Sequence, residues 1–209
     1  MLGEYIGSGS GVTKLLLHLN GNSSDTSGNS NSGTDTNITY VDGKFGKCAS
    51  FNGTTSVISL GYTAPTDNYT YSFWVNPVNF SIETGLIHNF LNSSSGRNIY
   101  IHLNQTTGVI DVDIPYIKGS VVTGVAVSAG SFSNIVVTRS GSDWRIYLNG
   151  NQVGSATDAT AQESTTTCRI GKTDGAQVLN GSIDEVILES RAWTASEIKK
   201  YYTNSLGRF

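Results

Sequence analysis

The stretch NGSIDEVILESRAWTASEIKKYY, from Asn180 to Tyr202, contains the signals that decide the fold. Its first half is an apolar segment typical of a buried strand, yet Asp184 and Glu185 stand side by side between Ile183 and Val186. Only 14% of the chain is charged, and a buried carboxylate without a partner costs several kcal/mol. The two acidic residues therefore need an explanation, which is either catalytic or structural.

The second half of this stretch predicts a short helix. Thr194 and Glu197 form a capping box in TASE, in which the hydroxyl and the carboxylate satisfy backbone groups where the helix begins. Ile198, Tyr201 and Tyr202 follow at helical spacing. We expect one short amphipathic helix near the C-terminus, packed on the edge of a β-structure.

Upstream of this stretch the dominant period is two. In VIDVDIP, Ile110, Val112 and Ile114 face one way and Asp111 and Asp113 face the other, which predicts a half-buried strand with one wet face. Other short segments of strand character are KLLLHL (Lys14–Leu19), KCASFNG, SVISLG, YTYSFWVNP, GLIHNFL, RNIYIHLN, VVTGVAVS, FSNIVVTRSG, DWRIYLNG and TCRIGK, with an Asn-Gly hairpin in LNGNQV (Leu148–Val153). So many short strands separated by turn signals predict an all-β fold, a two-sheet antiparallel β-sandwich.

Composition and charge exclude several classes of function. The 209 residues fit one domain, and a net charge of -3 without a basic patch gives no attraction to nucleic acid or to an anionic membrane surface. No apolar run is long enough to cross a bilayer. MLGEYIGSGSG lacks the apolar core of a signal peptide, so export would need another route or a longer parent chain. We expect a flexible lead-in over residues 1–11, one domain over 12–204 and a tail over 205–209.

Two further features concern loop order and the thiols. NGNSSDTSGNSNSGTDTN (Asn20–Asn37) has no apolar residue, which predicts a mobile loop that adds nothing to a core. Cys48 and Cys168 are expected to be buried thiols that act as small hydrophobes, with a single disulfide as the alternative. Neither has the CxxC or histidine partner that indicates a metal site.

Several motifs stand in the order seen in one known family. They are DTSGN (Asp25–Asn29), GKFGKCASFNG (Gly43–Gly53), YSFWVNP, WRIYLNG and GSIDEVILESRAWTASEI. Each motif alone is weak, but the ordered set resembles a LamG-like, concanavalin A-like jelly-roll domain, of the laminin G and pentraxin type, over Val12 to Asn204. The chain departs from the family pattern where Asn52 and Asn149 replace Asp, Phe132 replaces Trp and Trp193 replaces Leu.

The resemblance implies a structural Ca²⁺ site. In the family, the Ile-Asp-Glu-Val strand lies beside the N-terminal strand, so the resemblance predicts that the strands near Lys14–Leu19 and Asn180–Glu189 are adjacent. The Asp of that strand is associated in the family with a calcium ion that the Asp-x-Ser-Gly-Asn loop also holds. Carried over to this chain, the ligands are Asp25, the carbonyl of Gly28, Asn29 and Asp184, which supply part of the oxygen shell that calcium prefers. The alternative that stays open is that Asp184 simply accepts backbone hydrogen bonds.

Catalysis is not expected from the acidic residues. The family 16 glucanases, which share the implied fold, carry Glu-x-Asp-x-x-Glu on one strand, so that alternate carboxylates face one cleft. Here Asp184 and Glu185 are adjacent and should face opposite sides of a strand, while Glu185 and Glu189 share a face with no Asp between them. Asp111 and Asp113 lack a third acid. We therefore predict that the protein is not an enzyme.

The histidines and tryptophans have ordinary structural explanations. Strand or core positions account for His18, His88, His102, Trp74, Trp144 and Trp193. The aromatic residues left as platforms for a sugar ring are Tyr40, Tyr62, Tyr69, Tyr100 and Tyr116.

These observations predict a protein that binds rather than catalyses. The favoured function is a glycan-binding or adhesion module on a virion, a tail appendage or a microbial surface, and thus an extracellular location. The alternative is a structural decoration or assembly domain with a protein partner, and a minor alternative is a glycan hydrolase or lyase. The fold alone does not prove glycan binding, because one scaffold hosts many tasks.

Overall fold

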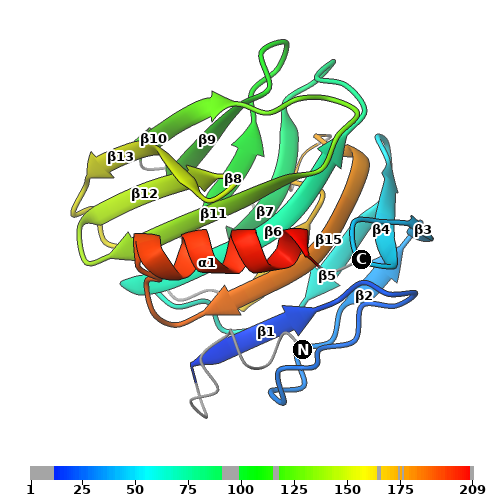
Figure 1. Ribbon diagram of the computed structural model, residues 1–209, viewed down its shortest axis with the longest axis horizontal. Coiled ribbons are helices and arrows are strands. Elements are labelled where there is room, and N and C mark those ends of the chain that lie inside the picture. Colours follow the sequence, from blue (N-terminus) through cyan, green and yellow to red (C-terminus); the bar gives the residue numbers. More distant parts are fainter. Residues whose placement is uncertain are drawn as a thin grey trace.

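The chain folds into two antiparallel β-sheets with one helix outside them (Figure 1). The computed structural model describes residues 12–90, 99–114, 118–163, 166–173, 175 and 177–207, so the expected lead-in lies outside the described residues. Sheet I consists, in strand order, of β13 (Asn151–Thr157), β12 (Asp143–Leu148), β11 (Ser133–Ser140), β6 (Asn68–Pro77), β15 (Asn180–Glu189), β4 (Lys47–Asn52) and β3 (Thr39–Asp42), with β1 (Thr13–Leu17) also paired to β15. Sheet II consists of β10 (Lys118–Ala126), β9 (Val109–Ile114), β8 (Tyr100–Leu103), β7 (Thr84–Phe90), β14 (Thr167–Ile170), β5 (Val57–Leu60) and β2 (Thr34–Thr36). The predicted fold class, a jelly-roll β-sandwich with one short C-terminal helix, is confirmed.

The first and last strands lie side by side, as the sequence predicted. Leu15 pairs with Leu188 and Leu17 pairs with Val186, so β1 is joined to β15. These leucines and Val186 belong to the apolar core between the two sheets. The chain ends are thereby fastened to each other through sheet I.

The alternating pattern places the core between the sheets. Ile110, Val112 and Ile114 of β9 are fully buried there, as their period predicted. Trp144 joins the same core, and its ring meets Tyr69 edge to face with centroids 6.0 Å apart. Cys48 and Cys168 are buried free thiols, as expected.

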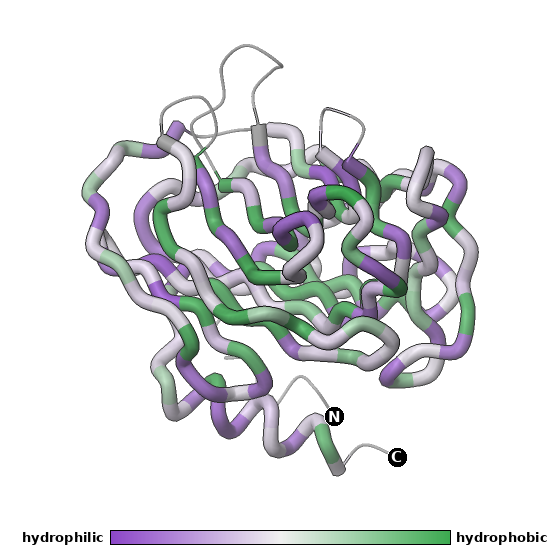
Figure 2. The backbone as a smooth tube through the Cα atoms, turned by 90° about the horizontal axis from the view of Figure 1, so that it is seen from above, coloured by the Kyte–Doolittle hydropathy of each residue, from purple (hydrophilic) through white to green (hydrophobic). Residues whose placement is uncertain are grey.

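The helix α1 (Ala195–Leu206) covers the outer face of sheet I, and Figure 2 shows it lying outside the sandwich. Both halves of the predicted capping box form, because the N–H of Glu197 donates to Thr194 Oγ1 and the N–H of Thr194 donates to Glu197 Oε2. Ile198 and Tyr201 are buried in a second apolar cluster that includes Trp193. No helix among the described residues is long and apolar enough to span a membrane.

A β-bulge in β15 explains the neighbouring acidic residues. The register of β15 against β6 shifts between Asp184 and Ile187, and Glu185 has a left-handed backbone with φ of 49°. Because of the extra residue, Ile183 and Val186 both face the inner core. Asp184 and Glu185 therefore both lie toward the outer side, where they are 0% and 1% exposed. The expectation that they face opposite sides was wrong, because it assumed an unbroken alternation.

The buried carboxylate of Glu185 has a partner from the other end of the chain. His18 follows β1, and its Nδ1 lies 3.0 Å from both carboxylate oxygens of Glu185. The pairing of β1 with β15 brings these two residues together. The pair is thus a structural contact, and it agrees with the structural explanation that the sequence predicted for His18.

Candidate functional site

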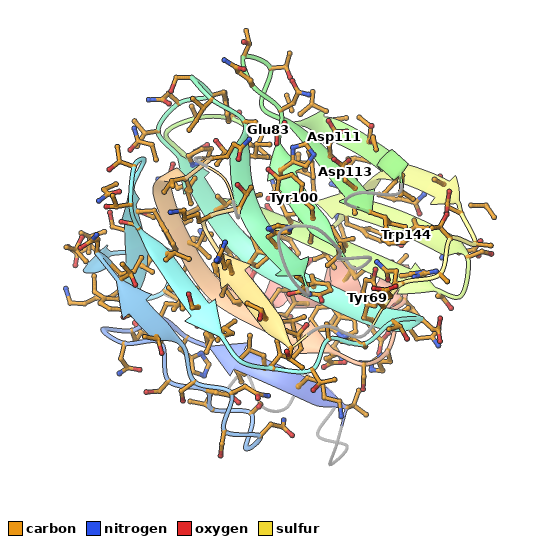
Figure 3. All side chains as sticks on the ribbon, turned by 180° about the vertical axis from the view of Figure 1, so that it is seen from behind. Tyr69, Glu83, Tyr100, Asp111, Asp113 and Trp144 are labelled. Carbon is orange, nitrogen blue, oxygen red and sulfur yellow. The ribbon has the colours of Figure 1, made fainter. Side chains whose placement is uncertain are left out.

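The outer face of sheet II carries polar and aromatic side chains that pair across its strands, and Figure 3 labels Tyr100, Asp111 and Asp113 among them. His88 of β7 pairs with Tyr100 of β8, which pairs with Asp113 of β9. His102 of β8 likewise pairs with Asp111 of β9. The period of two that buries the apolar residues of β8 and β9 brings these polar residues together on the opposite face.

Among the described side chains, three rings form the aromatic part of this face. The rings of Tyr100 and His102 are stacked, with centroids 4.3 Å apart and planes 10° apart. The His88 ring lies on the neighbouring strand β7. Its centroid is 5.2 Å from that of Tyr100, and the two ring planes are tilted by 56°. All three side chains are buried, so they form a fixed floor.

Three carboxylates surround the rings. The Tyr100 hydroxyl donates to Glu83 Oε1 at 2.8 Å, and the same oxygen lies 3.8 Å from His102 Nδ1. On the other side of the imidazole, Asp113 Oδ2 lies 3.3 Å from His102 Nε2. Asp111 accepts hydrogen bonds from side chains of β10 and is held in place by them. We call Glu83, Tyr100, His102, Asp111 and Asp113 the polar-aromatic cluster.

The polar-aromatic cluster retains unused hydrogen-bonding capacity. The His102 side chain is only 6% exposed, yet neither ring nitrogen makes a hydrogen bond of good geometry, and Asp113 Oδ1 is also buried without one. Buried polar groups are normally hydrogen-bonded, so each such atom needs an explanation. The cluster opens toward solvent through Glu83 and Asp113, whose side chains are 38% and 23% exposed. Fixed rings beside free acceptors suit a hydroxyl-rich ligand.

Sequence reasoning found part of this cluster. It predicted the polar face of β9 with Asp111 and Asp113, and it named Tyr100 as a platform. It missed Glu83, which precedes β7 in a loop and therefore follows no strand period. It predicted a structural strand position for His102, whose Nε2 lies 3.3 Å from Asp113 Oδ2 without making a hydrogen bond of good geometry.

The other aromatic candidates do not join the polar-aromatic cluster. Tyr62 and Tyr69 belong to the inner core, and Tyr40 lies on β3 with its hydroxyl donating to Asp35. Tyr116 lies outside the described residues. Trp74, expected in a core position, is buried beneath α1, where its ring stacks on Tyr202 with centroids 5.8 Å apart.

Asp25 fixes the loop that the sequence predicted to be mobile. The N–H groups of Leu16, Ser27 and Asn31 and the Ser27 hydroxyl donate to its two oxygens at 2.9 to 3.0 Å. Although burial acts in the opposite direction, these hydrogen bonds hold the pKa of Asp25 below its ordinary value. Asn29, from the same loop, uses its side-chain amide to donate to the carbonyl of Thr13 at 2.7 Å.

Asp184 lies in a separate environment. Its Oδ2 accepts the N–H groups of Lys44 and Phe45, each at 3.0 Å, while its Oδ1 is buried without a hydrogen bond. Burial raises the pKa of Asp184 to about 7. The backbone hydrogen bonds that the alternative hypothesis required are therefore present.

The structure does not bring Asp25 and Asp184, the two carboxylates among the proposed calcium ligands, together. Asp25 forms an isolated β-bridge with Leu17 along one edge of β1. The strand β15, which carries Asp184, pairs with the opposite edge of β1. Because neighbouring strands are about 4.8 Å apart, a whole strand separates Asp25 from β15. The oxygens of Asp25 already accept hydrogen bonds, which fits a bonded carboxylate rather than a calcium ligand. Among the described residues, no three His, Cys, Asp or Glu side chains are grouped to hold a metal ion.

Calcium binding by Asp25, Gly28, Asn29 and Asp184 stays a prediction, which the melting temperature tests. Millimolar calcium over a site of micromolar affinity would stabilise the fold by roughly 4 kcal/mol. The calcium hypothesis therefore requires a melting temperature that rises with calcium, falls with a chelator and no longer responds in Asp184→Asn or Asp25→Asn. A melting temperature that the chelator leaves unchanged would leave hydrogen bonding as the role of both carboxylates.

Comparison with known proteins supports the architecture. Residues 51–199 match the family model described as the concanavalin A-like lectin/glucanases superfamily. No curated protein sequence matches the chain. The family match covers most of both sheets, including β7 to β9 with the polar-aromatic cluster.

Several solved structures are similar to this chain. Domain 4 of AbnA, a GH43 extracellular arabinanase from Geobacillus stearothermophilus solved in complex with arabinotriose, has a TM-score of 0.77 and 22% identity over 91% of this chain and 98% of that chain. The binding domain of Paraclostridial Mosquitocidal Protein 1 has a TM-score of 0.76 and 18% identity, covering 92% of this chain and 52% of that chain. The botulinum neurotoxin serotype D binding domain has a TM-score of 0.70 and 15% identity, covering 92% and 52%. The chain thus spans about half the length of the two toxin domains, and at these identities the likeness shows the fold alone.

Proposed function

Because the chain belongs to the concanavalin A-like lectin/glucanase superfamily, we propose that it is a non-catalytic module that binds glycans through the outer face of sheet II. The observation that carries this proposal is the polar-aromatic cluster. Its exposed carboxylates, Glu83 and Asp113, offer hydrogen-bond acceptors above the buried Tyr100 and His102 rings, and the Tyr100 hydroxyl holds Glu83 in place. Sugar hydroxyl groups are the donors that such acceptors require.

The similar structures support a role in binding. The AbnA domain was solved with arabinotriose, and two other neighbours are binding domains of toxins. AbnA is an extracellular enzyme, which accords with the proposed location of this module on a cell surface or a virion. The carboxylates of the cluster hold neighbouring side chains in place, which suits ligand positioning more than chemistry.

Asp113→Ala is expected to weaken glycan binding by about 10- to 100-fold, because hydrogen bonds to charged groups are worth roughly 1.5–3 kcal/mol. A glycan array with the wild-type protein identifies a ligand, and titration calorimetry then compares the variants. Asp42→Ala serves as the matched control, since Asp42 is an exposed aspartate on β3 of the other sheet. Reducing-end release should stay at background throughout.

Two results would count against the proposal. One is a wild-type protein that binds nothing on a broad array. The other is a ligand whose affinity Asp113→Ala and Asp42→Ala leave equally unchanged, which would place the site elsewhere on the molecule.

A further inference from the structure

Resting on the proposed function, we propose that the polar-aromatic cluster accepts neutral, hydroxyl-rich sugars and excludes sugars that carry carboxylate or sulfate groups. This selectivity follows from the charged side chains that face the site and from the hydrogen-bond donors that their atoms require.

Among the described side chains, the charge around the site is predominantly negative. Glu83 and Asp113 flank the imidazole of His102 at 3.8 and 3.3 Å, and Asp111 is the cross-strand neighbour of His102. A positive charge lies beside this group on β14, where Arg169 pairs with His88. That guanidinium donates to the carbonyl of Thr173 at 3.2 Å, so part of its hydrogen-bonding capacity is already used.

The unpartnered atoms indicate what the ligand must supply. An ionised carboxylate only accepts hydrogen bonds, so Asp113 Oδ1 needs a donor. Sugar hydroxyls can donate to the more exposed carboxylates of the cluster, Glu83 and Asp113, whose side chains are 38% and 23% exposed. A ligand carboxylate or sulfate has no proton to donate. It would place like charges at hydrogen-bond distance in a partly buried site, where water screens them weakly.

The positions of Glu83 and Asp113 make them the expected selective elements. They are the more exposed carboxylates of the cluster, whereas Asp111 is buried and accepts hydrogen bonds from Thr123 and Ser120 at 2.6 and 3.2 Å. An incoming ligand therefore meets Glu83 and Asp113 first. Like-charge juxtaposition is a common way in which binding sites reject a wrong partner.

The test compares neutral oligosaccharides with their acidic counterparts. The array carries neutral oligosaccharides, arabinotriose among them, and each hexose-based member is printed beside the same oligosaccharide oxidised at C6 to the uronic acid. We expect the wild type to bind its neutral ligand at least roughly tenfold more tightly than the oxidised form at low salt. The Glu83→Gln/Asp113→Asn double variant keeps the side-chain shapes and should lose most of that preference, whereas Asp42→Asn should retain it.

The possible results are distinct. Equal or tighter wild-type binding of the oxidised member overturns this inference and leaves glycan binding standing. Binding to no glycan at all overturns the proposed function, and this inference with it. If the double variant does not fold, the wild type still decides, because electrostatic exclusion must shrink as the salt concentration rises. A preference that salt does not change would mean that shape, not charge, selects the ligand.

Discussion

Asp184→Ala is expected to lower the free energy of unfolding at pH 5 by about 2–4 kcal/mol, because it leaves one buried and one part-buried N–H group without an acceptor. These are the amides of Lys44 and Phe45, which hold the turn after β3 against β15. Urea unfolding followed by tryptophan fluorescence gives the measurement. The matched control is Asp184→Asn, whose side-chain oxygen can accept the same two hydrogen bonds and which should lose much less.

The same pair of proteins tests the ionisation of Asp184. Burial raises its pKa from 3.8 to about 7 in the folded state, so the folded chain holds a proton that the unfolded chain releases at lower pH. The stabilising contribution of this group is therefore complete below about pH 4 and is lost as the pH rises to about 7. A shift of this size corresponds to about 4 kcal/mol. Relative to Asp184→Asn, the wild type should become less stable across this range, and a constant difference would show that the carboxyl keeps an ordinary pKa.

Gly171→Ala is expected to cost about 2–4 kcal/mol of stability, because overpacking of a core and a left-handed backbone both penalise the new methyl group. Gly171 follows β14 with φ of 77°, and a Cβ there would overlap the ring of Phe51 in the core. Gly141→Ala isolates the backbone contribution, since Gly141 also has a positive φ, 58°, but no atom lies within 4 Å of its Cβ position. Chemical denaturation should therefore show a loss several times larger at Gly171. Equal losses would mean that the Phe51 ring moves aside at little cost.

The sequence predicted those features that repeat along the chain. The alternation in β9 predicted which face of the strand is buried, and TASE predicted where α1 begins. The ordered motifs predicted the pairing of β1 with β15. Each of these signals is local, or belongs to a pattern that the whole family shares.

The features that could not be predicted depend on single contacts between distant segments. Glu83 joins the polar-aromatic cluster only because its loop returns to Tyr100 and His102 across the end of sheet II. The polar loop after β1 has no apolar residue to hold it, and yet Asp25 organises it through backbone donors. Neither contact leaves a periodic trace in the sequence.

The bulge at Glu185 shifts the phase of β15 by one residue. Upstream of it the core-facing positions include Ile183, and downstream they are Val186 and Leu188, so they fall on odd numbers before the shift and on even numbers after it. Deleting Glu185 would leave every one of these side chains on its present face in an unbroken alternation. The chain therefore carries one residue more than the sheet requires, and the position of that residue alone decides that both acidic side chains lie on the side of the helix. A regular strand of the same composition would have sent one of them into the core.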